Sequence, residues 1–274
     1  MAGSRNRDDY CYRHPRAESF VLCQRCGKTI CPECQIQAAV GFHCPDCAGV
    51  KKSGGLGGLL RRGSSGSVSV GTRPTATYVL LGIIVAVYAG QLLSGGLLTQ
   101  LFLYWPPLTA LEPWRMVTTM FVHSQSSVFH ILFNGYSLFI LGTLVERLIG
   151  PGRFVTLFLL SGFGGSVLVS LLSPTSAVVG ASGAIFGLFG ALFVIQRSFG
   201  GANTQLLIVL GLNLVMGFIV PGISWQAHIG GLITGAIAAN IMVKTRGEDP
   251  KQQRQGLGLV VLGLVALTVL GVVV

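Results

Sequence analysis

The sequence predicts an all-α membrane protein that carries a small metal-binding domain at its N-terminus. Three observations lead to this fold class. Of the 274 residues, 51% are hydrophobic and only 10% are charged, whereas soluble domains carry roughly 25% charged residues. After residue 75 the chain contains seven apolar stretches of about 18 to 22 residues, enough for a helix to cross a bilayer. All seven cysteines lie between Cys11 and Cys47, outside these stretches.

The N-terminal head, residues 1–50, arranges its cysteines in pairs separated by two residues. No apolar leader opens the printed sequence, so we expect the head to stay in the cytoplasm, where disulfides are disfavoured. The spacing is instead typical of zinc ligands, and eight ligands suffice for two tetrahedral zinc ions. The pairs are Cys11 and His14, Cys23 and Cys26, Cys31 and Cys34, and Cys44 and Cys47, with His43 as a spare candidate.

The spacing of these pairs resembles that of B-box-type zinc fingers, whose pairs interleave. The resemblance implies one metal site from the first and third pairs and another from the second and fourth, and sequential pairing is the alternative. Because the head contains few apolar residues, metal binding should supply most of its folding energy. We expect the head to bind a protein partner or to regulate the membrane domain. Its basic residues are not clustered with aromatic ones, which argues against nucleic acid.

The membrane domain begins after a basic, Gly/Ser-rich linker at 51–74, which suits a flexible chain near an anionic membrane surface. Lipid leaves only helices for apolar stretches of this pattern. These stretches lie at 76–95, 128–149, 154–172, 180–198, 204–221, 225–243 and 256–274. The segment at 96–127 carries four aromatic residues that suit the water–lipid interface, so we expect it to lie in the outer leaflet. They are Tyr104, Trp105, Trp114 and Phe121.

The basic residues predict the orientation of the spans. Of the 19 lysines and arginines, 18 fall on the side of the head and linker, and Arg115 alone falls on the other. The positive-inside rule therefore predicts a cytoplasmic N-terminus, and seven spans then place the C-terminus outside. We expect a multi-pass protein of the cell membrane.

Few polar side chains lie inside the apolar stretches, so each one is informative. Ser182 lies in the stretch at 180–198 and His228 in that at 225–243, and glycines follow both residues at helical spacing. Such glycines let two helices approach closely, and close packing alone explains the serine motif taken singly. For the histidine taken singly, the alternative is an ion or proton path or a packed hydrogen bond. Together they permit a hydroxyl and an imidazole to meet. Because the last three of the six core stretches contain no acidic residue, a Ser-His dyad is expected rather than a triad.

His130 and Asn134 are four residues apart, so they face the same side of the predicted helix at 128–149. An imidazole and an amide can both donate hydrogen bonds to the oxyanion that develops during acyl transfer. The alternative is a polar bond between two helices.

Four motifs together resemble the rhomboid intramembrane serine proteases. They are "EPWRMVTTMFVH", "HILFN", "GASGAIFG" and "AHIGG", in the order that the family has them. The resemblance covers about residues 75–245 and implies a rhomboid-like bundle of six transmembrane helices there. Residues 246–274 would add a seventh, as in the family's "six plus one" variants.

The resemblance also implies a role for each polar residue. Ser182 would be the nucleophile and His228 the general base, while His130, Asn134 and the backbone of Ser182 would line the oxyanion hole. Trp114 with Arg115 would stabilise the outer loop, and Glu146 with Arg147 would be structural. One position departs from the family, because Phe186 stands where a tyrosine often stacks on the histidine. Stacking needs only the ring face, so we expect activity to survive.

These features predict a serine endopeptidase that cleaves membrane-anchored proteins within or near a transmembrane segment. Its catalysis would need no cofactor. The alternative is a catalytically silent rhomboid-like protein that binds membrane clients, which would be recognised by loss of the serine or histidine. A transporter would require paired ionisable groups at mid-membrane or an internal repeat, and the sequence has neither.

Overall fold

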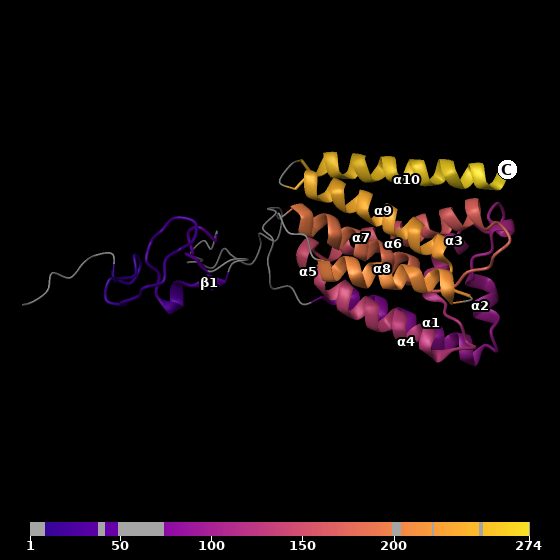
Figure 1. The fold of residues 1–274 in the computed structure, drawn as a ribbon, viewed down its shortest axis with the longest axis horizontal. Helices are drawn as coiled ribbons and strands as arrows, with labels where there is room; N and C mark the ends of the chain where they lie inside the picture. Colours follow the sequence, from indigo (N-terminus) through magenta and orange to yellow (C-terminus); the bar gives the residue numbers. More distant parts are fainter. Residues whose placement is uncertain are drawn as a thin grey trace, which may run out of the picture. The chain divides into compact units, whose positions relative to one another are not determined.

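The computed structural model describes residues 9–37, 42–48, 74–198, 204–220, 222–246 and 249–273. The chain divides into two compact units, Met1–Ser65 and Gly66–Val274, which are described separately (Figure 1). The predicted linker lies outside the described residues, apart from Pro74 at its end.

The head is a small, irregular unit built around its cysteines. Its regular elements are a 3₁₀ turn η2, Pro32–Cys34, and two antiparallel strands, β1, Ile36–Gln37, and β2, Phe42–His43. Five of the six residues in its buried cluster are cysteines, and Ile30 is the sixth. Within the part of the head that the structure describes, a single buried aliphatic side chain cannot supply an ordinary hydrophobic core, so the cysteine side chains make up most of its interior.

The membrane domain forms a helix in each of the seven predicted stretches (Figure 1). Among the described residues, five helical segments are long and apolar enough to cross a membrane, and two apolar helices, of 17 and 16 residues, are shorter. The five are α1, Thr75–Leu93; the segment Val128–Ile149; α6, Pro151–Leu172; α9, Trp225–Lys244; and α10, Pro250–Val273. The shorter two are α7, Ser182–Ser198, and α8, Thr204–Ile219. The chain is therefore a mostly helical, multi-pass membrane protein.

The segment Val128–Ile149 is helical throughout, but its hydrogen-bonding pattern changes along its length. It consists of α4, Val128–Ser137, a π-helical turn η5, Leu138–Gly142, and α5, Thr143–Ile149. A π turn inserts an extra residue into the helical repeat, so it changes which residues share a face above and below it. His130 and Asn134 both precede the turn and keep their common face.

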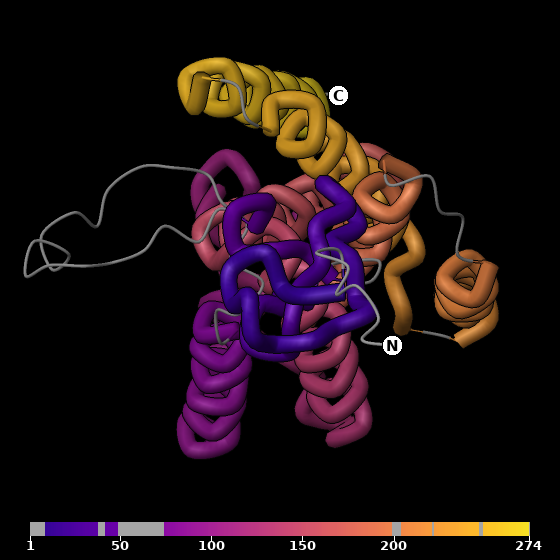
Figure 2. The backbone as a smooth tube through the Cα atoms, turned by 90° about the vertical axis from the view of Figure 1, so that its left-hand side faces the viewer, coloured from indigo at the N-terminus to yellow at the C-terminus, as the bar shows by residue number. Residues whose placement is uncertain are grey.

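The centre of the bundle is formed by α6, α7 and α9, whose glycines allow very close approach. A Cβ atom added at Gly231 would lie 1.9 Å from the carbonyl oxygen of Gly183, and one at Gly235 would lie 2.2 Å from that of Gly187. No side chain larger than hydrogen fits at such distances, so the glycines predicted to form packing faces do so. Figure 2 shows α8, in orange, at the edge of the bundle, apart from this tightly packed centre.

Glu146, in the middle of α5, caps the start of α1. Its carboxylate accepts hydrogen bonds from the backbone N–H of Ala76 at 2.9 Å and from the N–H and hydroxyl of Thr77, both at 2.7 Å. These N–H groups belong to the first turn of a helix, where no intrahelical partner exists and where negative charge is favoured. Glu146 thus has a structural role, as expected, because it anchors the start of α1 to α5.

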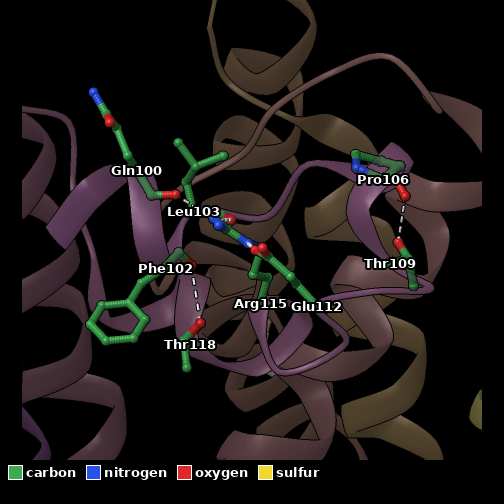
Figure 3. Close-up of polar contacts among 8 residues, drawn as sticks. All are labelled: Gln100, Phe102, Leu103, Pro106, Thr109, Glu112, Arg115 and Thr118. Carbon is green, nitrogen blue, oxygen red and sulfur yellow. Dashed lines mark hydrogen bonds and ion pairs between the residues drawn. The ribbon is translucent and has the colours of Figure 1, made fainter. Parts of the chain in front are cut away.

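The loop before α4 contains only short helical turns, in agreement with the prediction that it is not a span. They are α2, Leu97–Phe102; η3, Pro106–Leu108; α3, Arg115–Thr118; and η4, Thr119–Phe121. The buried Arg115 guanidinium pairs with Glu112 and donates to the carbonyl oxygens of Gln100 and, at 3.1 Å, Leu103 (Figure 3). One arginine therefore ties the start of the loop to its middle.

One expectation for this loop was wrong. Tyr104 does not lie at the water–lipid interface but is fully buried, with its hydroxyl 2.9 Å from that of Thr109. Its backbone pairs with Val178, four residues before Ser182, through hydrogen bonds of 3.1 and 2.8 Å. The tyrosine thus joins the loop to the segment that leads into α7, and its polar atom is satisfied inside the protein.

Candidate active site and metal centres

Ser182 is the first residue of α7, and the segment before it is held by the loop that precedes α4. Gly180 has φ +113°, a backbone conformation that other residues rarely adopt. Its N–H donates to the carbonyl oxygen of Thr119 at 3.0 Å, and the Thr119 hydroxyl donates to that of Val178 at 2.6 Å. The start of α7 is therefore fixed by backbone contacts.

His228 lies in the first turn of α9, where the Ser224 hydroxyl caps the helix by accepting from the Ala227 N–H at 3.2 Å. Its ring stacks on that of Phe186, with ring centroids 4.0 Å apart and an interplanar angle of 11°. Phe186 is one turn after Ser182, so the expected stack is present with the phenylalanine. A Cβ at Gly183 would lie 3.1 Å from the Ala227 carbonyl oxygen, which brings the neighbours of Ser182 and His228 together.

No acidic side chain orients His228 among the described residues. Its Nδ1 atom is buried and has no hydrogen-bond partner. The contacts of the described residues include no direct hydrogen bond between Ser182 and His228, so what joins the two helices here is the stack and the glycine packing.

His130 and Asn134 approach the site from α4. A Cβ at Gly180 would lie 2.7 Å from His130 Nε2 and 3.9 Å from Asn134 Nδ2, so both side chains face the segment just before Ser182. The Asn134 amide donates to the His130 carbonyl oxygen at 2.8 Å, and its buried Oδ1 has no partner. Three helices, α4, α7 and α9, thus bring the four residues predicted from sequence into one region.

Two buried residues beside this region were not among the site residues predicted from the sequence. His123 is fully buried, neither of its ring nitrogens has a hydrogen-bond partner, and its ring centroid lies 5.3 Å from that of His130. Gln91, on α1, is also fully buried and bonds to the His123 backbone. Gln91 could have been found as a polar residue inside an apolar stretch. His123 could have been found because it ends the loop motif, in "FVH".

The eight predicted metal ligands form two clusters in the head, and the pairs interleave. One cluster contains Cys11, His14, Cys31 and Cys34, the other Cys23, Cys26, Cys44 and Cys47, and the ligand atoms within each lie no more than 4.8 Å apart. His43 belongs to neither cluster.

The distances between ligand atoms fit a tetrahedral metal. His14 Nδ1 lies 3.2 Å from Cys31 Sγ and 3.5 Å from Cys34 Sγ, and the Sγ atoms of Cys26 and Cys44 lie 3.7 Å apart. Zinc bond lengths of about 2.3 Å to sulfur and 2.0 Å to nitrogen give tetrahedral edges of roughly 3.5 to 3.8 Å. The three distances lie within a few tenths of an ångström of these edges, so each cluster could hold such an ion after small adjustments.

In each cluster the backbone favours the thiolate form of at least one cysteine, whereas burial raises the pKa of Cys34, and hydrogen bonding with Cys44 raises the pKa of Cys47, each to about 12. Burial raises the pKa of the Cys11 thiol, but backbone hydrogen bonds, that from Cys31 first among them, outweigh it and lower the pKa to about 6. Cys23 behaves in the same way, since the Cys44 N–H donates to its sulfur at 3.2 Å and its pKa also falls to about 6. Thiolates that accept backbone N–H groups are prepared for metal binding.

These observations define a class: a helical multi-pass membrane protein in which serine, histidine and asparagine side chains gather beside a glycine-packed helix crossing. Comparison with known proteins gives the family. The Rhomboid domain model matches residues 110–245. The Bacillus subtilis (strain 168) protein YdcA, which bears a rhomboid name, is 34% identical over 141 residues, covering 49% of this chain and 70% of YdcA. The chain belongs to the rhomboid family.

Longer relatives match over part of their length. The rhomboid protease GluP of Bacillus subtilis (strain 168) is 33% identical over 190 residues, which cover 65% of this chain and 37% of GluP. The mitochondrial RHOMBOID-like protein 6 of Arabidopsis thaliana is 37% identical over 131 residues, 45% of this chain and 42% of that protein. The matches therefore span less than half of these two relatives.

Proposed function

We propose that this chain is an intramembrane serine endopeptidase that cleaves membrane-anchored proteins within or near a transmembrane segment. Ser182 is the nucleophile and His228 the general base. The observation that carries the proposal is the Phe186–His228 stack one turn from Ser182, at a helix crossing where glycines bring the two backbones into contact. The relatives named as rhomboid proteases support the same reaction class.

In the proposed reaction, Ser182 Oγ attacks the scissile carbonyl carbon while His228 accepts the hydroxyl proton. The histidine then gives this proton to the leaving amine, and water hydrolyses the acyl-enzyme by the same steps. His130, Asn134 and the Ser182 N–H donate to the oxyanion. The stack on Phe186 sets the plane of the His228 ring, a task that an acidic residue performs in a triad. Catalytic hydrogen bonds often shorten only when substrate binds, which accounts for the missing Ser182–His228 bond.

A cleavage assay with matched serine variants tests this proposal. Ser182→Ala and His228→Ala should each abolish cleavage of a membrane-anchored reporter and labelling by a fluorophosphonate, while the protein stays folded and inserted. Ser161→Ala is the control, because Ser161 is buried in α6 and its hydroxyl has no partner. It should leave cleavage unchanged. Retained cleavage in either dyad variant would refute the assignment, and client binding without cleavage by the wild type would favour the silent alternative.

For the head, we propose that the two clusters hold two structural zinc ions and that the domain binds a protein partner or regulates the enzyme. We further propose a cell-membrane protein with a cytoplasmic head and an external C-terminus. Its parts are the head at 1–50, the linker at 51–74, a six-helix core at 75–245 and the seventh helix with its loop at 246–274. The interleaved donor geometry supports the zinc assignment, and metal analysis of the purified full chain tests it, with two zinc ions per chain expected.

A further inference from the structure

Gln91, near the end of α1, holds the backbone of one residue in the loop that leads to α4. The His123 N–H donates to Gln91 Oε1 at 3.0 Å, and Gln91 Nε2 donates to the His123 carbonyl oxygen at 2.8 Å. Both residues are fully buried. Since buried backbone groups need partners, this side-chain amide satisfies both groups of His123 and fixes its position.

The next residue, Ser124, connects the fixed His123 backbone to the His130 ring. The Ser124 N–H donates to His130 Nδ1 at 3.1 Å. A backbone N–H can only donate, so Nδ1 is the nitrogen without a proton, and the neutral ring carries its proton on Nε2. A doubly protonated ring would place one N–H against another, so the same contact also favours the neutral form.

The protonated nitrogen is the one that faces the site. A Cβ at Gly180 would lie 2.7 Å from His130 Nε2, and Gly180 is two residues before Ser182. The fully buried His123 ring lies beside that of His130, at an interplanar angle of 58°, and restricts its rotation. The ring is thus held with a donor directed toward the start of α7.

We propose that Gln91 is a positioning residue for oxyanion stabilisation. By fixing the His123 backbone it presents the Ser124 N–H to His130, which sets the tautomer that makes Nε2 a hydrogen-bond donor. This inference rests on the proposed function, in which His130 stabilises the oxyanion. The His130 donor acts on charge that is present only in the transition state. Loss of its positioning by Gln91 should therefore lower kcat and leave KM nearly unchanged.

The test compares Gln91→Leu and Gln91→Glu with a control at Thr99. Gln91 Nε2 also donates to the Thr99 hydroxyl at 2.6 Å. Thr99→Val removes that bond, together with the 3.1 Å bond from the Thr99 hydroxyl to Gln125 Oε1, and leaves both bonds to His123. Gln91→Leu should lower kcat at least tenfold, short of the ~10²–10³-fold that outright loss of a donor costs. Gln91→Glu keeps the acceptor for the His123 N–H, so its kcat should lie between that of the wild type and that of Gln91→Leu. The kcat of Thr99→Val should stay within twofold of the wild-type value.

Nitrogen-15 NMR of the histidine rings supplies a readout that does not need activity. The His130 signals, assigned by their loss in His130→Asn, should show a bare Nδ1 and a protonated Nε2 in the wild type, and a mixture of tautomers in Gln91→Leu. A protonated Nδ1 in the wild type would overturn the inference, even if Gln91→Leu does not fold. So would a folded Gln91→Leu with wild-type kcat. If the wild type has the expected tautomer but cleaves no reporter, the proposed function fails and the geometry stands.

Discussion

Substituting Gly231 by alanine tests whether the α7–α9 crossing sets the catalytic geometry. A Cβ there would lie 1.9 Å from the Gly183 carbonyl oxygen, whereas ordinary contact begins at 3.4 Å. The two backbones must therefore separate by about 1.5 Å, and they carry Ser182 and His228. A misplacement of ~1 Å can cost ~10²-fold in rate, and overpacking costs about 1–3 kcal/mol of stability. We expect Gly231→Ala to lower kcat/KM about 10²-fold. It should also lower the free energy of unfolding by about 1–3 kcal/mol.

The assay is cleavage of a membrane-anchored reporter in proteoliposomes, with thermal unfolding measured on the same samples. Gly211→Ala is the matched control, because a Cβ at Gly211, in the middle of α8, meets nothing within 4 Å. It should change neither quantity. Wild-type kcat/KM and stability in Gly231→Ala would refute the reasoning, and equal losses in both variants would show that any added methyl group harms this bundle.

Four further outcomes are expected. Asn134→Ala should lower kcat about 10²-fold, since one oxyanion donor is lost, and the same reporter should detect residual cleavage above that of Ser182→Ala. Glu146→Ala leaves two N–H groups and a hydroxyl of α1 without an acceptor and should lower the free energy of unfolding by about 2–3 kcal/mol, measured by chemical denaturation. A cysteine introduced at 173–178 should react with an impermeant thiol reagent from outside, and labelling only from the cytoplasmic side would reverse the topology. Cys11→Ser should reduce the zinc content and loosen both halves of the head, because each cluster draws ligands from both; an unchanged zinc content would contradict this.

Features with a local signal were predictable from the sequence. Apolar length identified the seven helical stretches, and glycine spacing identified the faces of α7 and α9 that meet. Two-residue spacing identified the residues of the two Cys/His clusters, although spacing alone could not decide how the pairs combine. The choice between interleaved and sequential pairs depends on how the chain returns on itself, and the structure gives the interleaved set.

Features that depend on distant contacts were not predictable. Tyr104 has the composition of an interfacial residue, but its pairing with Val178 buries it. Glu146 was expected to be structural, yet its partner Thr77 is 69 residues away. The π turn at Leu138–Gly142 adds no apolar or polar signal to the stretch that contains it. For Tyr104 and Glu146 the deciding contact joins segments that the local sequence pattern does not relate.

Uncharged groups orient the histidines of this site because the site lies among apolar helices. A buried carboxylate is expensive inside a membrane, and α7, α8 and α9 contain no acidic residue. The orienting tasks therefore fall to uncharged groups. The Phe186 ring face sets the plane of His228, and a backbone N–H beside the neutral Gln91 amide sets the tautomer of His130. The carboxylate that does lie buried, that of Glu146, accepts N–H groups at a helix start, where the helix dipole stabilises negative charge. Introducing an acidic residue beside His228 to complete a triad should therefore destabilise this protein more than it aids catalysis.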